Sequence, residues 1–199
     1  LQTEDITVFE TVPSLLSAFL EGLPEEAPLP SLRWLIPTGE ALPVPLAVRW
    51  YSRYPGIPLL NAYGPTEASD DITHYVVPAD IRIDQPYIPI GRPGLNMRTY
   101  ILDRYQHPCP PGVRGEICVS GICVGLGYWK DEERSSRAFV ANPLSGGDAA
   151  YGRLYRTGDQ GYYQPDGNLV CTGRLDTQIK LRGNRIELGE IEHVLGSYA

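Results

Sequence analysis

The sequence predicts an α/β protein with a parallel-sheet subdomain, a small β-rich subdomain resembling a distorted barrel, and the start of a mobile α+β domain. Three observations lead to this prediction. Strand-like and helix-like apolar segments alternate over the first 60 residues, a pattern typical of parallel α/β sheets. From about residue 91, short β-type runs are divided by Pro-Gly and Asp-Gly turns, and beyond residue 176 a strand is followed by a helix. We therefore expect divisions at 1–90, 91–175 and 176–199.

The first part contains three expected strands and two expected helices. A buried strand over 6–9 precedes a helix that Pro13 opens and Gly22 ends. Further along, the apolar patterns predict a strand over 32–37, a helix over 45–54 and a strand over 57–60. In parallel α/β sheets, ligands bind at the carboxyl ends of the strands. The segments that follow these strands are therefore the first places to look for a site.

The second part is expected to be mostly β structure. Its strands are predicted over 99–102, 116–120 and 169–172, with one helix over 132–139. A last strand and a helix beginning near Leu188 should form the third part.

Composition and charge exclude several classes of partner. Among 199 residues, 42% are apolar and 21% charged, so a buried core can form. The net charge of −7 argues against binding to nucleic acid or to an anionic membrane. No apolar run approaches the ~20 residues that span a bilayer, and no signal-like segment is present, so we expect a cytoplasmic protein.

The cysteines do not form a metal-binding or disulfide pattern. Cys109, Cys118, Cys123 and Cys171 lack a C-x-x-C spacing, and only three histidines accompany them. We expect reduced thiols and neither a zinc site nor a disulfide framework.

One stretch after the third predicted strand combines every type of group that a nucleotide needs. Asn61 offers an amide for the edge of a purine, and Tyr63 offers a flat face for a base. Gly64 allows close approach of the backbone, Thr66 offers a hydroxyl to a phosphate, and Glu67 offers a hard carboxylate to Mg²⁺. The alternative is an ordinary polar loop that ends a strand.

The order of these residues carries a family resemblance. Residues 61–67, Asn-Ala-Tyr-Gly-Pro-Thr-Glu, resemble the adenine-binding motif of the adenylate-forming superfamily, in the form found in amino-acid-activating domains of nonribosomal peptide synthetases. Residues 155–159, Tyr-Arg-Thr-Gly-Asp, resemble the ribose-binding turn of that family. Residues 173–192 resemble its hinge and the start of its mobile C-terminal domain. The chain is thus identified as a member of this family.

The resemblance implies a two-step reaction that uses ATP and Mg²⁺. The carboxylate of an amino acid attacks the α-phosphorus of ATP, and the aminoacyl group is then transferred to the phosphopantetheine thiol of a peptidyl carrier domain. In the family, a phosphate-binding loop lies upstream of the region that this sequence covers, and an essential lysine lies downstream of it. We therefore expect this chain to need the missing flanks of its own domain and neighbouring synthetase domains as partners, and to be inactive alone.

The resemblance also assigns roles to individual residues. Thr66 and Glu67 are the expected catalytic residues, with Thr66 at an α-phosphate oxygen and Glu67 at Mg²⁺. Asp159 and Arg174 are expected at the ribose; alternatively, Asp159 caps its own backbone in a turn. The remaining nucleotide-binding positions are Gly39, Glu40, Ala41, Asn61, Ala62, Tyr63 and Gly64. The chain departs from the family at Cys171, where an aromatic residue is usual.

The hinge is expected at Asp176, whose dihedral angles would change as the C-terminal domain rotates. Lys180, Arg182 and Gly183 would then face the active site in the thiolation state. The alternative is that Lys180, Arg182 and Arg185 form the solvated face of a strand.

Six positions are implied to select the amino acid, and three of them are acidic. Clustered carboxylates repel one another and lose hydration unless a cation joins them, so we expect a substrate with a cationic side chain. 2,4-Diaminobutyrate is the first expectation, followed by ornithine, lysine and arginine. Alternatively, Ser69, Asp70 and Asp71 cap a helix. The six positions are Glu10, Ile36, Thr38, Ala62, Asp70 and Asp71.

Two other functions remain open from the sequence. A coenzyme A ligase or luciferase-like enzyme would share the nucleotide motifs but should have an apolar acyl pocket. A non-catalytic subdomain that acts as a scaffold would bind nucleotide weakly or not at all.

Overall fold

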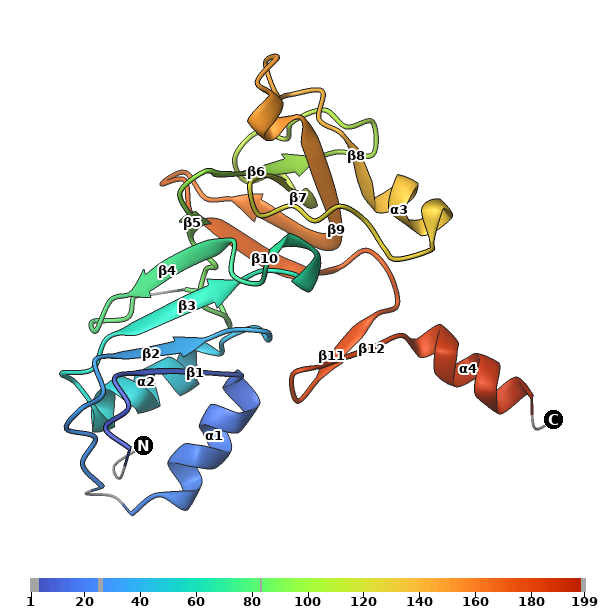
Figure 1. The fold of residues 1–199 in the computed structure, drawn as a ribbon. Helices are drawn as coiled ribbons and strands as arrows, with labels where there is room; N and C mark the ends of the chain where they lie inside the picture. Colours follow the sequence, from blue (N-terminus) through green and yellow to red (C-terminus); the bar gives the residue numbers. More distant parts are fainter. Residues whose placement is uncertain (1–3, 25–26, 83, 198–199) are drawn as a thin grey trace.

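The computed structural model describes residues 4–24, 27–82 and 84–197. It contains two five-stranded sheets, followed by a two-stranded hairpin and a C-terminal helix. Figure 1 shows the hairpin and helix extending away from the two sheets. No helix among the described residues is long and apolar enough to cross a membrane.

The first sheet has the strand order β1-β2-β3-β4-β5, in which β1, β2 and β3 are parallel and the last two strands are antiparallel to their neighbours. Its strands are β1 (Val8–Thr11), β2 (Trp34–Pro37), β3 (Leu59–Tyr63), β4 (Thr73–Val77) and β5 (Arg92–Pro93). Helices α1 (Pro13–Gly22) and α2 (Val44–Arg53) follow β1 and β2. The carboxyl ends of the three parallel strands therefore share one edge, as expected.

The core of this part packs the helices against the sheet. Leu16 of α1 and Trp50 of α2 are both 0% exposed and share one cluster with Leu35 and Leu59 of the central strands. The helix α1 begins where the sequence predicts, because Pro13 occupies its first turn, where a missing N–H costs nothing.

The second sheet is antiparallel, with the order β10-β9-β7-β6 and with β8 also paired to β9. Its strands are β6 (Met97–Leu102), β7 (Gly115–Gly121), β8 (Phe139–Ala141), β9 (Arg153–Tyr163) and β10 (Leu169–Arg174). The helix α3 (Glu132–Ala138) precedes β8, and the 3₁₀ turn η2 (Ala149–Tyr151) precedes β9. The other 3₁₀ turn, η1 (Thr66–Ala68), lies between β3 and β4 of the first sheet.

The two sheets share a hydrophobic core. Tyr63 and Ile72, which belong to the first sheet and its connecting loop, pack in one cluster with Ile117, Tyr155 and Leu169 of the second. The sheets therefore have fixed relative positions, and residues from both can build one site.

The C-terminal segment consists of the hairpin β11 (Ile179–Leu181) and β12 (Asn184–Ile186), followed by α4 (Leu188–Gly196). The exposed apolar side chains of α4 include Ile191, Val194 and Leu195.

The predicted fold class is confirmed, but several boundaries were wrong. The first strand begins at Val8, and this edge strand is not buried, since Val8 is 49% exposed. Residues 61–63 lie in β3 rather than in a loop, and residues 155–159 lie within β9 rather than in a turn. Strand β4 was not predicted. Because each strand is paired on both sides, extended backbone continues through residues that look like loop residues in sequence.

Candidate functional site

A cavity of about 180 Å³ lies at the carboxyl edge of the parallel strands, between the first sheet, the end of the second sheet and the C-terminal hairpin. Predicted nucleotide-binding residues from four separate segments line it. They are Gly39, Glu40, Ala41, Ala62, Tyr63, Asp159 and Arg174, joined by Tyr87, Ile88, Ile90, Cys171, Gly173, Gln178 and Lys180.

Tyr63 ends β3 at the wall of this cavity. The side chain is 8% exposed, and its hydroxyl donates a hydrogen bond to Oδ2 of Asp159 at 2.5 Å. Burial, and then the neighbouring Asp159 charge, raise the pKa of Tyr63 well above its ordinary value, so the hydroxyl stays protonated and remains a donor. The bond fixes the ring in one orientation beside the cavity.

Asn61 lies behind the cavity wall and does not line it. Its side chain is 1% exposed, and Nδ2 donates to the carbonyl of Pro89 at 2.8 Å and to that of Ile88 at 3.4 Å. Its Oδ1 is buried without a hydrogen-bond partner. A buried amide oxygen without a donor is costly, and the exocyclic amine of adenine is a donor of the right kind. The chemistry of this position thus fits a purine.

The loop between β3 and β4 folds back on itself because of Gly64. A Cβ atom at Gly64 would lie 1.3 Å from the carbonyl oxygen of Asp70, which no side chain could tolerate. The amide of Ile72 donates to the carbonyl of Tyr63 at 2.8 Å and closes the loop. Asp70 and Asp71 therefore lie beside the carboxyl end of β3.

Asp159 is paired within the protein. Its Oδ1 accepts a bond from Nη1 of Arg174 at 2.8 Å, and the side chain of Asp159 is 9% exposed. Arg174 also binds both carboxylate oxygens of Asp176, at 2.6 and 2.5 Å, and donates to the carbonyl of Thr157. Burial lowers the pKa of Arg174, but Asp176 and Asp159 raise it further, so the guanidinium is always charged. The turn-capping alternative for Asp159 is wrong, because its carboxylate binds these distant groups.

Thr66 and Glu67 begin the 3₁₀ turn after β3, with Thr66 exposed and Glu67 half-buried. Oε1 of Glu67 accepts a hydrogen bond from the hydroxyl of Tyr128 at 2.7 Å. Mg²⁺ is commonly held by one or two carboxylates together with substrate phosphates, so a single oriented carboxylate at this place fits that ion.

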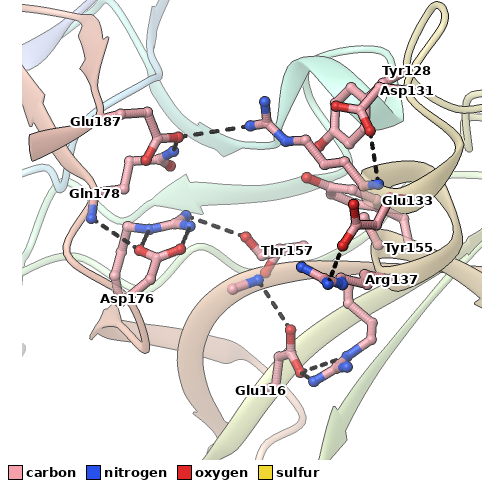
Figure 2. A pocket seen from close by; sticks show the side chains of 15 residues that line it. Glu116, Tyr128, Asp131, Glu133, Arg137, Tyr155, Thr157, Asp176, Gln178 and Glu187 are labelled. Carbon is pink, nitrogen blue, oxygen red and sulfur yellow. Dashed lines mark hydrogen bonds and ion pairs between the residues drawn. The ribbon is translucent and has the colours of Figure 1, made fainter. Parts of the chain in front are cut away.

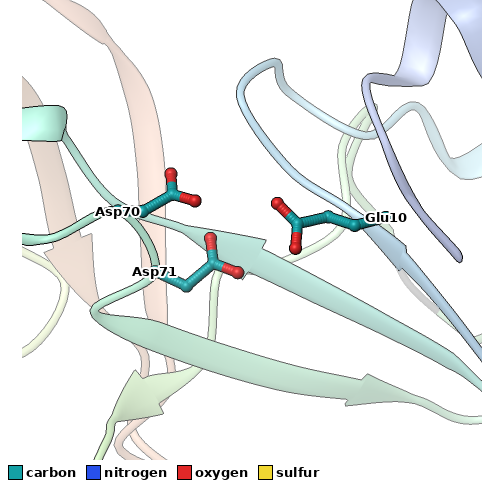
Figure 3. Close-up of side chains that lie close together, drawn as sticks. All are labelled: Glu10, Asp70 and Asp71. Carbon is teal, nitrogen blue, oxygen red and sulfur yellow. The ribbon is translucent and has the colours of Figure 1, made fainter. Parts of the chain in front are cut away.

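The three predicted acids converge (Figure 3). One carboxylate oxygen each from Glu10, Asp70 and Asp71 lie within 4.8 Å of one another. Glu10 projects from β1, while Asp70 and Asp71 end the loop before β4. We call these three residues the acidic corner. The helix-capping alternative is wrong, because a 3₁₀ turn precedes these residues and a strand follows them.

Among the residues that the structure describes, no ion pair joins the acidic corner to an arginine or lysine, and the basic group that acts on Asp71 is His74. The pKa of Glu10 is raised by burial and then by the charges of Asp71 and Asp70. The pKa of Asp71 is raised by burial, despite the hydrogen bond that Thr38 Oγ1 donates to Oδ1 at 2.7 Å and despite His74, which lowers it. Ile36 pairs with Glu10 across β1 and β2 and is half-buried. Glu10 and Asp70 are exposed rather than enclosed by a deep pocket.

The C-terminal hairpin faces this site with its tip. The amide of Gly183 donates to Oε1 of Glu40 at 2.7 Å, and Glu40 also accepts bonds from Ser14 at the start of α1. Gly183 has a φ of +78°, and a Cβ there would lie 2.9 Å from Cγ1 of Val12. Lys180 lines the cavity, so it is not simply on a solvated strand face. Arg182 is exposed, and the side chain of Arg185 lies outside the described residues.

Cys171 lines the cavity at the position where the family usually has an aromatic residue. Burial, followed by the charge of Asp159, raises the pKa of the thiol to about 11. The thiol is therefore neutral near pH 7 and adds a small apolar surface to the cavity.

A second, larger groove of about 600 Å³ lies beside the first site, between α3, β9 and the C-terminal segment (Figure 2). It contains residues that sequence reasoning missed, namely Tyr128, Arg134, Gln178 and Glu187. The contacts of Tyr128 with Glu67 and of Arg134 with Glu187 join positions far apart in the sequence. In the sequence, the adjacent aromatic residues Tyr128 and Trp129 are a signal for this region, and Trp129 is exposed in the structure.

Comparison with known proteins places the chain in a family. The family model described as "AMP-binding enzyme" matches residues 1–129. The chain belongs to the AMP-binding enzyme family. Among related AMP-binding enzymes, phosphinothricin tripeptide synthetase PhsB of Streptomyces viridochromogenes is 42% identical over 201 residues, a match that covers all of this chain and 16% of PhsB.

Solved structures agree with this family assignment. PA1221, described as a nonribosomal peptide synthetase protein containing adenylation and PCP domains, matches with a TM-score of 0.86 and 33% identity, over 94% of this chain and 32% of that one. The adenylation domain AlmE of Vibrio cholerae, solved with glycyl-adenosine-5'-phosphate, matches with a TM-score of 0.80 and 32% identity, over 98% and 36% of the two chains. The resemblance to adenylation domains of nonribosomal peptide synthetases is confirmed, and this AMP-binding chain spans well under half the length of these relatives.

Proposed function

We propose that this chain forms part of an adenylation domain that activates a cationic amino acid with ATP for nonribosomal peptide synthesis. One observation carries the proposal. Three carboxylates lie within 4.8 Å of one another at the sheet edge that also borders the cavity lined by Tyr63 and Asp159. A nucleotide and a positively charged side chain could thus bind close together.

The nucleotide would bind in the cavity, with its base beside the ring of Tyr63. Asn61 would act from behind the wall, where its amide binds the carbonyls of Ile88 and Pro89 and so supports the part of the wall that Ile88 forms. Asp159 would accept hydrogen bonds from the ribose hydroxyls. The carboxylate retains acceptor capacity beside its bonds to Tyr63 and Arg174, since two carboxylate oxygens offer about four lone-pair sites. Gly39, Glu40, Ala41, Ala62 and Gly64 would contribute surrounding surface.

Catalysis would come mostly from positioning and from neutralising phosphate charge. Thr66 would donate its hydroxyl to an α-phosphate oxygen. Glu67, oriented by Tyr128, would hold Mg²⁺ against the phosphates. When bound, Mg²⁺ supplies positive charge that offsets the charge developing on the phosphate oxygens. AlmE, whose structure contains an aminoacyl adenylate, supports this class of reaction for the relatives.

The substrate would place its side-chain ammonium among Glu10, Asp70 and Asp71. We rank 2,4-diaminobutyrate first, then ornithine, lysine and arginine. The ranking follows from crowding, because three acids that share one small volume leave little room for a long side chain. Ile36, Thr38 and Ala62 would form the neighbouring walls.

Transfer of the aminoacyl group would follow on a phosphopantetheine carried by a peptidyl carrier domain. PA1221 contains an adenylation and a PCP domain, which supports such a partner. We retain the division into residues 1–90, 91–175 and 176–199, with Asp176 as the hinge. Lys180, Arg182 and Gly183 would face the site during transfer, and the contact between Gly183 and Glu40 is consistent with that orientation.

Pyrophosphate exchange by the full-length protein tests the proposal. The substrates are diaminobutyrate, ornithine, lysine, arginine and leucine, each assayed with ATP and Mg²⁺. We expect exchange with one of the cationic amino acids and little with leucine. Exchange with leucine alone would refute the acidic corner as a specificity site. Activity only with fatty or aryl acids would indicate a coenzyme A ligase, and no activity with any acid would indicate a scaffold.

A further inference from the structure

The C-terminal segment contacts the two sheets at two separated points. At the hairpin tip, Gly183 donates to Glu40 beside the first sheet. At the end of the hairpin, Oε1 of Glu187 lies 3.8 Å from Nη2 of Arg134, which belongs to α3 beside the second sheet. One contact would leave the segment free to swivel about Asp176, whereas two contacts on different supports fix its orientation.

Besides its ion pair with Glu187, Arg134 makes contacts within its own part of the chain that fix its position. Its backbone amide donates to Oδ1 of Asp131, which caps α3, at 2.9 Å. Its guanidinium lies 4.6 Å from the ring centroid of Tyr128, a distance typical of cation–π contacts. The ring of Tyr128 meets Phe139 edge-on at 5.5 Å, so it is a fixed platform.

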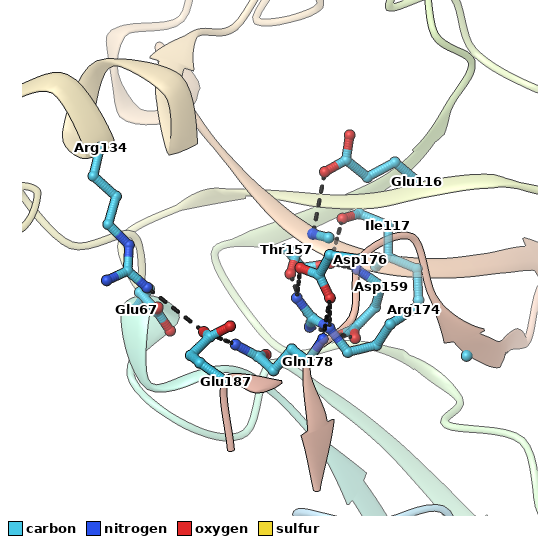
Figure 4. A network of polar contacts seen from close by, with 12 residues as sticks. Glu67, Glu116, Ile117, Arg134, Thr157, Asp159, Arg174, Asp176, Gln178 and Glu187 are labelled. Carbon is cyan, nitrogen blue, oxygen red and sulfur yellow. Dashed lines mark hydrogen bonds and ion pairs between the residues drawn. The ribbon is translucent and has the colours of Figure 1, made fainter. Parts of the chain in front are cut away.

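The same residues connect the hinge segment to the proposed metal ligand, and Figure 4 shows the part of this series from Arg134 through Glu187 to Gln178. Tyr128 donates its hydroxyl to Glu67, and its ring supports Arg134. Arg134 faces Glu187, which also accepts a hydrogen bond from Gln178 close to the hinge. A contiguous series of contacts thus runs from Glu67 to the segment that closes the nucleotide cavity.

We infer that Arg134 is a positioning residue that holds the C-terminal segment in the orientation seen here, in which the hairpin closes the nucleotide cavity. This inference rests on the proposed function, because it assigns this orientation to aminoacyl transfer rather than to adenylate formation. Arg134 does not line the nucleotide cavity, so we assign its effect to the balance between the two half-reactions.

The expected effect is modest. The side chains of Arg134 and Glu187 are 54% and 37% exposed, and exposed ion pairs contribute up to about 1 kcal/mol, which corresponds to about fivefold in an equilibrium. Repulsion between like charges has a similar size and the opposite sign. The ratio of carrier loading to pyrophosphate exchange, with both rates measured on the same protein, resolves a change of this size.

Charge exchange in the full-length protein tests the inference. Arg134→Glu and Glu187→Arg should each lower the ratio of carrier loading to pyrophosphate exchange about fivefold. The double variant should recover part of the ratio, because the ion pair is rebuilt with its charges exchanged while the contact of residue 134 with Tyr128 and the hydrogen bond from Gln178 are lost. Hydrogen–deuterium exchange over residues 179–186 should rise in the single variants and return in part in the double one, and this measurement needs no catalysis.

The ion pair of Arg137 and Glu133 supplies the control, since it lies within α3 and does not contact Glu187. Exchanging the charges of Arg137 and Glu133 should leave the ratio of carrier loading to pyrophosphate exchange unchanged. The inference is overturned if Arg134→Glu leaves both ratio and hydrogen exchange unaltered, if the double variant does not recover, or if the control shifts the ratio equally. Absence of pyrophosphate exchange in the wild type refutes the proposed function instead, while hydrogen exchange still reports on the contact.

Discussion

Carboxylates on the two sheets, Asp159 in β9 and Glu10 in β1, have different electrostatic surroundings. Asp159 is buried and bonded to Arg174 and Tyr63, both of which belong to the protein. Glu10 and Asp71 in the acidic corner face other acids, and their pKa values are raised. Asp159 thus has a cationic partner within the fold, which it shares with Asp176, while no ion pair joins the acidic corner to an arginine or lysine among the described residues.

The difference indicates which group recognises a charged ligand and which recognises a neutral one. Ribose hydroxyls carry no charge, so a carboxylate that binds them can be neutralised within the protein at no loss to recognition. A cationic side chain requires the opposite arrangement, since affinity comes from negative charge that the protein itself leaves uncompensated. Five predictions test these assignments, beginning with the largest effect.

Arg174→Met should destabilise the protein strongly. The substitution keeps much of the apolar stem but leaves Asp159 buried without its cation, and such losses commonly cost ~3–5 kcal/mol. Glu10→Gln, by contrast, should leave the free energy of unfolding unchanged or raise it, because it relieves repulsion. Urea unfolding of the 199-residue chain, followed by tryptophan fluorescence, measures both. Equal midpoints for the Arg174→Met variant and the wild type would contradict the compensated state of Asp159.

Changing Asp70 and Asp71 together to Asn should lower kcat/KM for the preferred cationic amino acid about 100-fold. A 100-fold loss corresponds to about 2.7 kcal/mol, which lies within the ~1.5–3 kcal/mol that one charged hydrogen bond contributes. The KM for ATP should stay within about twofold, because neither acid lines the nucleotide cavity. Glu190→Gln with Glu192→Gln removes the same charge from α4 and serves as the control. A collapse in ATP affinity would show that the two aspartates are misassigned.

Binding of the cationic amino acid should release protons. Glu10 and Asp71 have ordinary pKa values of 4.5 and 3.8, and both values are raised in the empty acidic corner. An arriving ammonium lowers them again, so affinity should increase as pH rises through the window above these ordinary values. Calorimetry at about pH 5 in two buffers of different ionisation enthalpy counts the protons. Glu10→Gln should reduce the release, and equal heats in both buffers would contradict the prediction.

The same pKa shifts determine the sign of a stability effect. A carboxyl group whose folded pKa is raised binds more protons in the folded chain than in the unfolded chain. Its contribution to stability is therefore present at low pH and is lost as pH rises through the window above the ordinary values. Glu10→Gln should flatten this part of the pH profile of the substrate-free chain.

Cys171→Tyr should tighten ATP binding about threefold to fivefold. A tyrosine there would give the base a second aromatic face, and contacts of this kind contribute ~1 kcal/mol. The dissociation constant of ATP, measured by fluorescence titration, reports the change. Cys109→Tyr, outside the cavity, is the matched control. Weaker binding in the Cys171→Tyr variant would mean that the cavity is already filled by the nucleotide or does not hold it.

Much of the fold could be predicted because local patterns and tertiary structure agree. Pro13 and Gly22 do bound α1, and the alternation of strand and helix does produce parallel strands. The errors concern β3 and β9, where residues typical of loops are extended because neighbouring strands pair with them. Such pairing depends on partners far along the chain, which local propensity cannot report.

The candidate site divides in the same way. Sequence by itself determined which chemical groups follow the ends of the parallel strands. The expectation that Glu10, Asp70 and Asp71 would meet came from the resemblance to the family, which assigns these positions to the substrate pocket. Tertiary structure alone decided which charges are neutralised. Tyr63 and Asp159 are 96 residues apart, and Arg134 and Glu187 lie on different elements, so these contacts depend on how the two sheets and the C-terminal segment pack. Whether one charge compensates another depends on the distance between them in space, and that distance cannot be read from their positions along the chain.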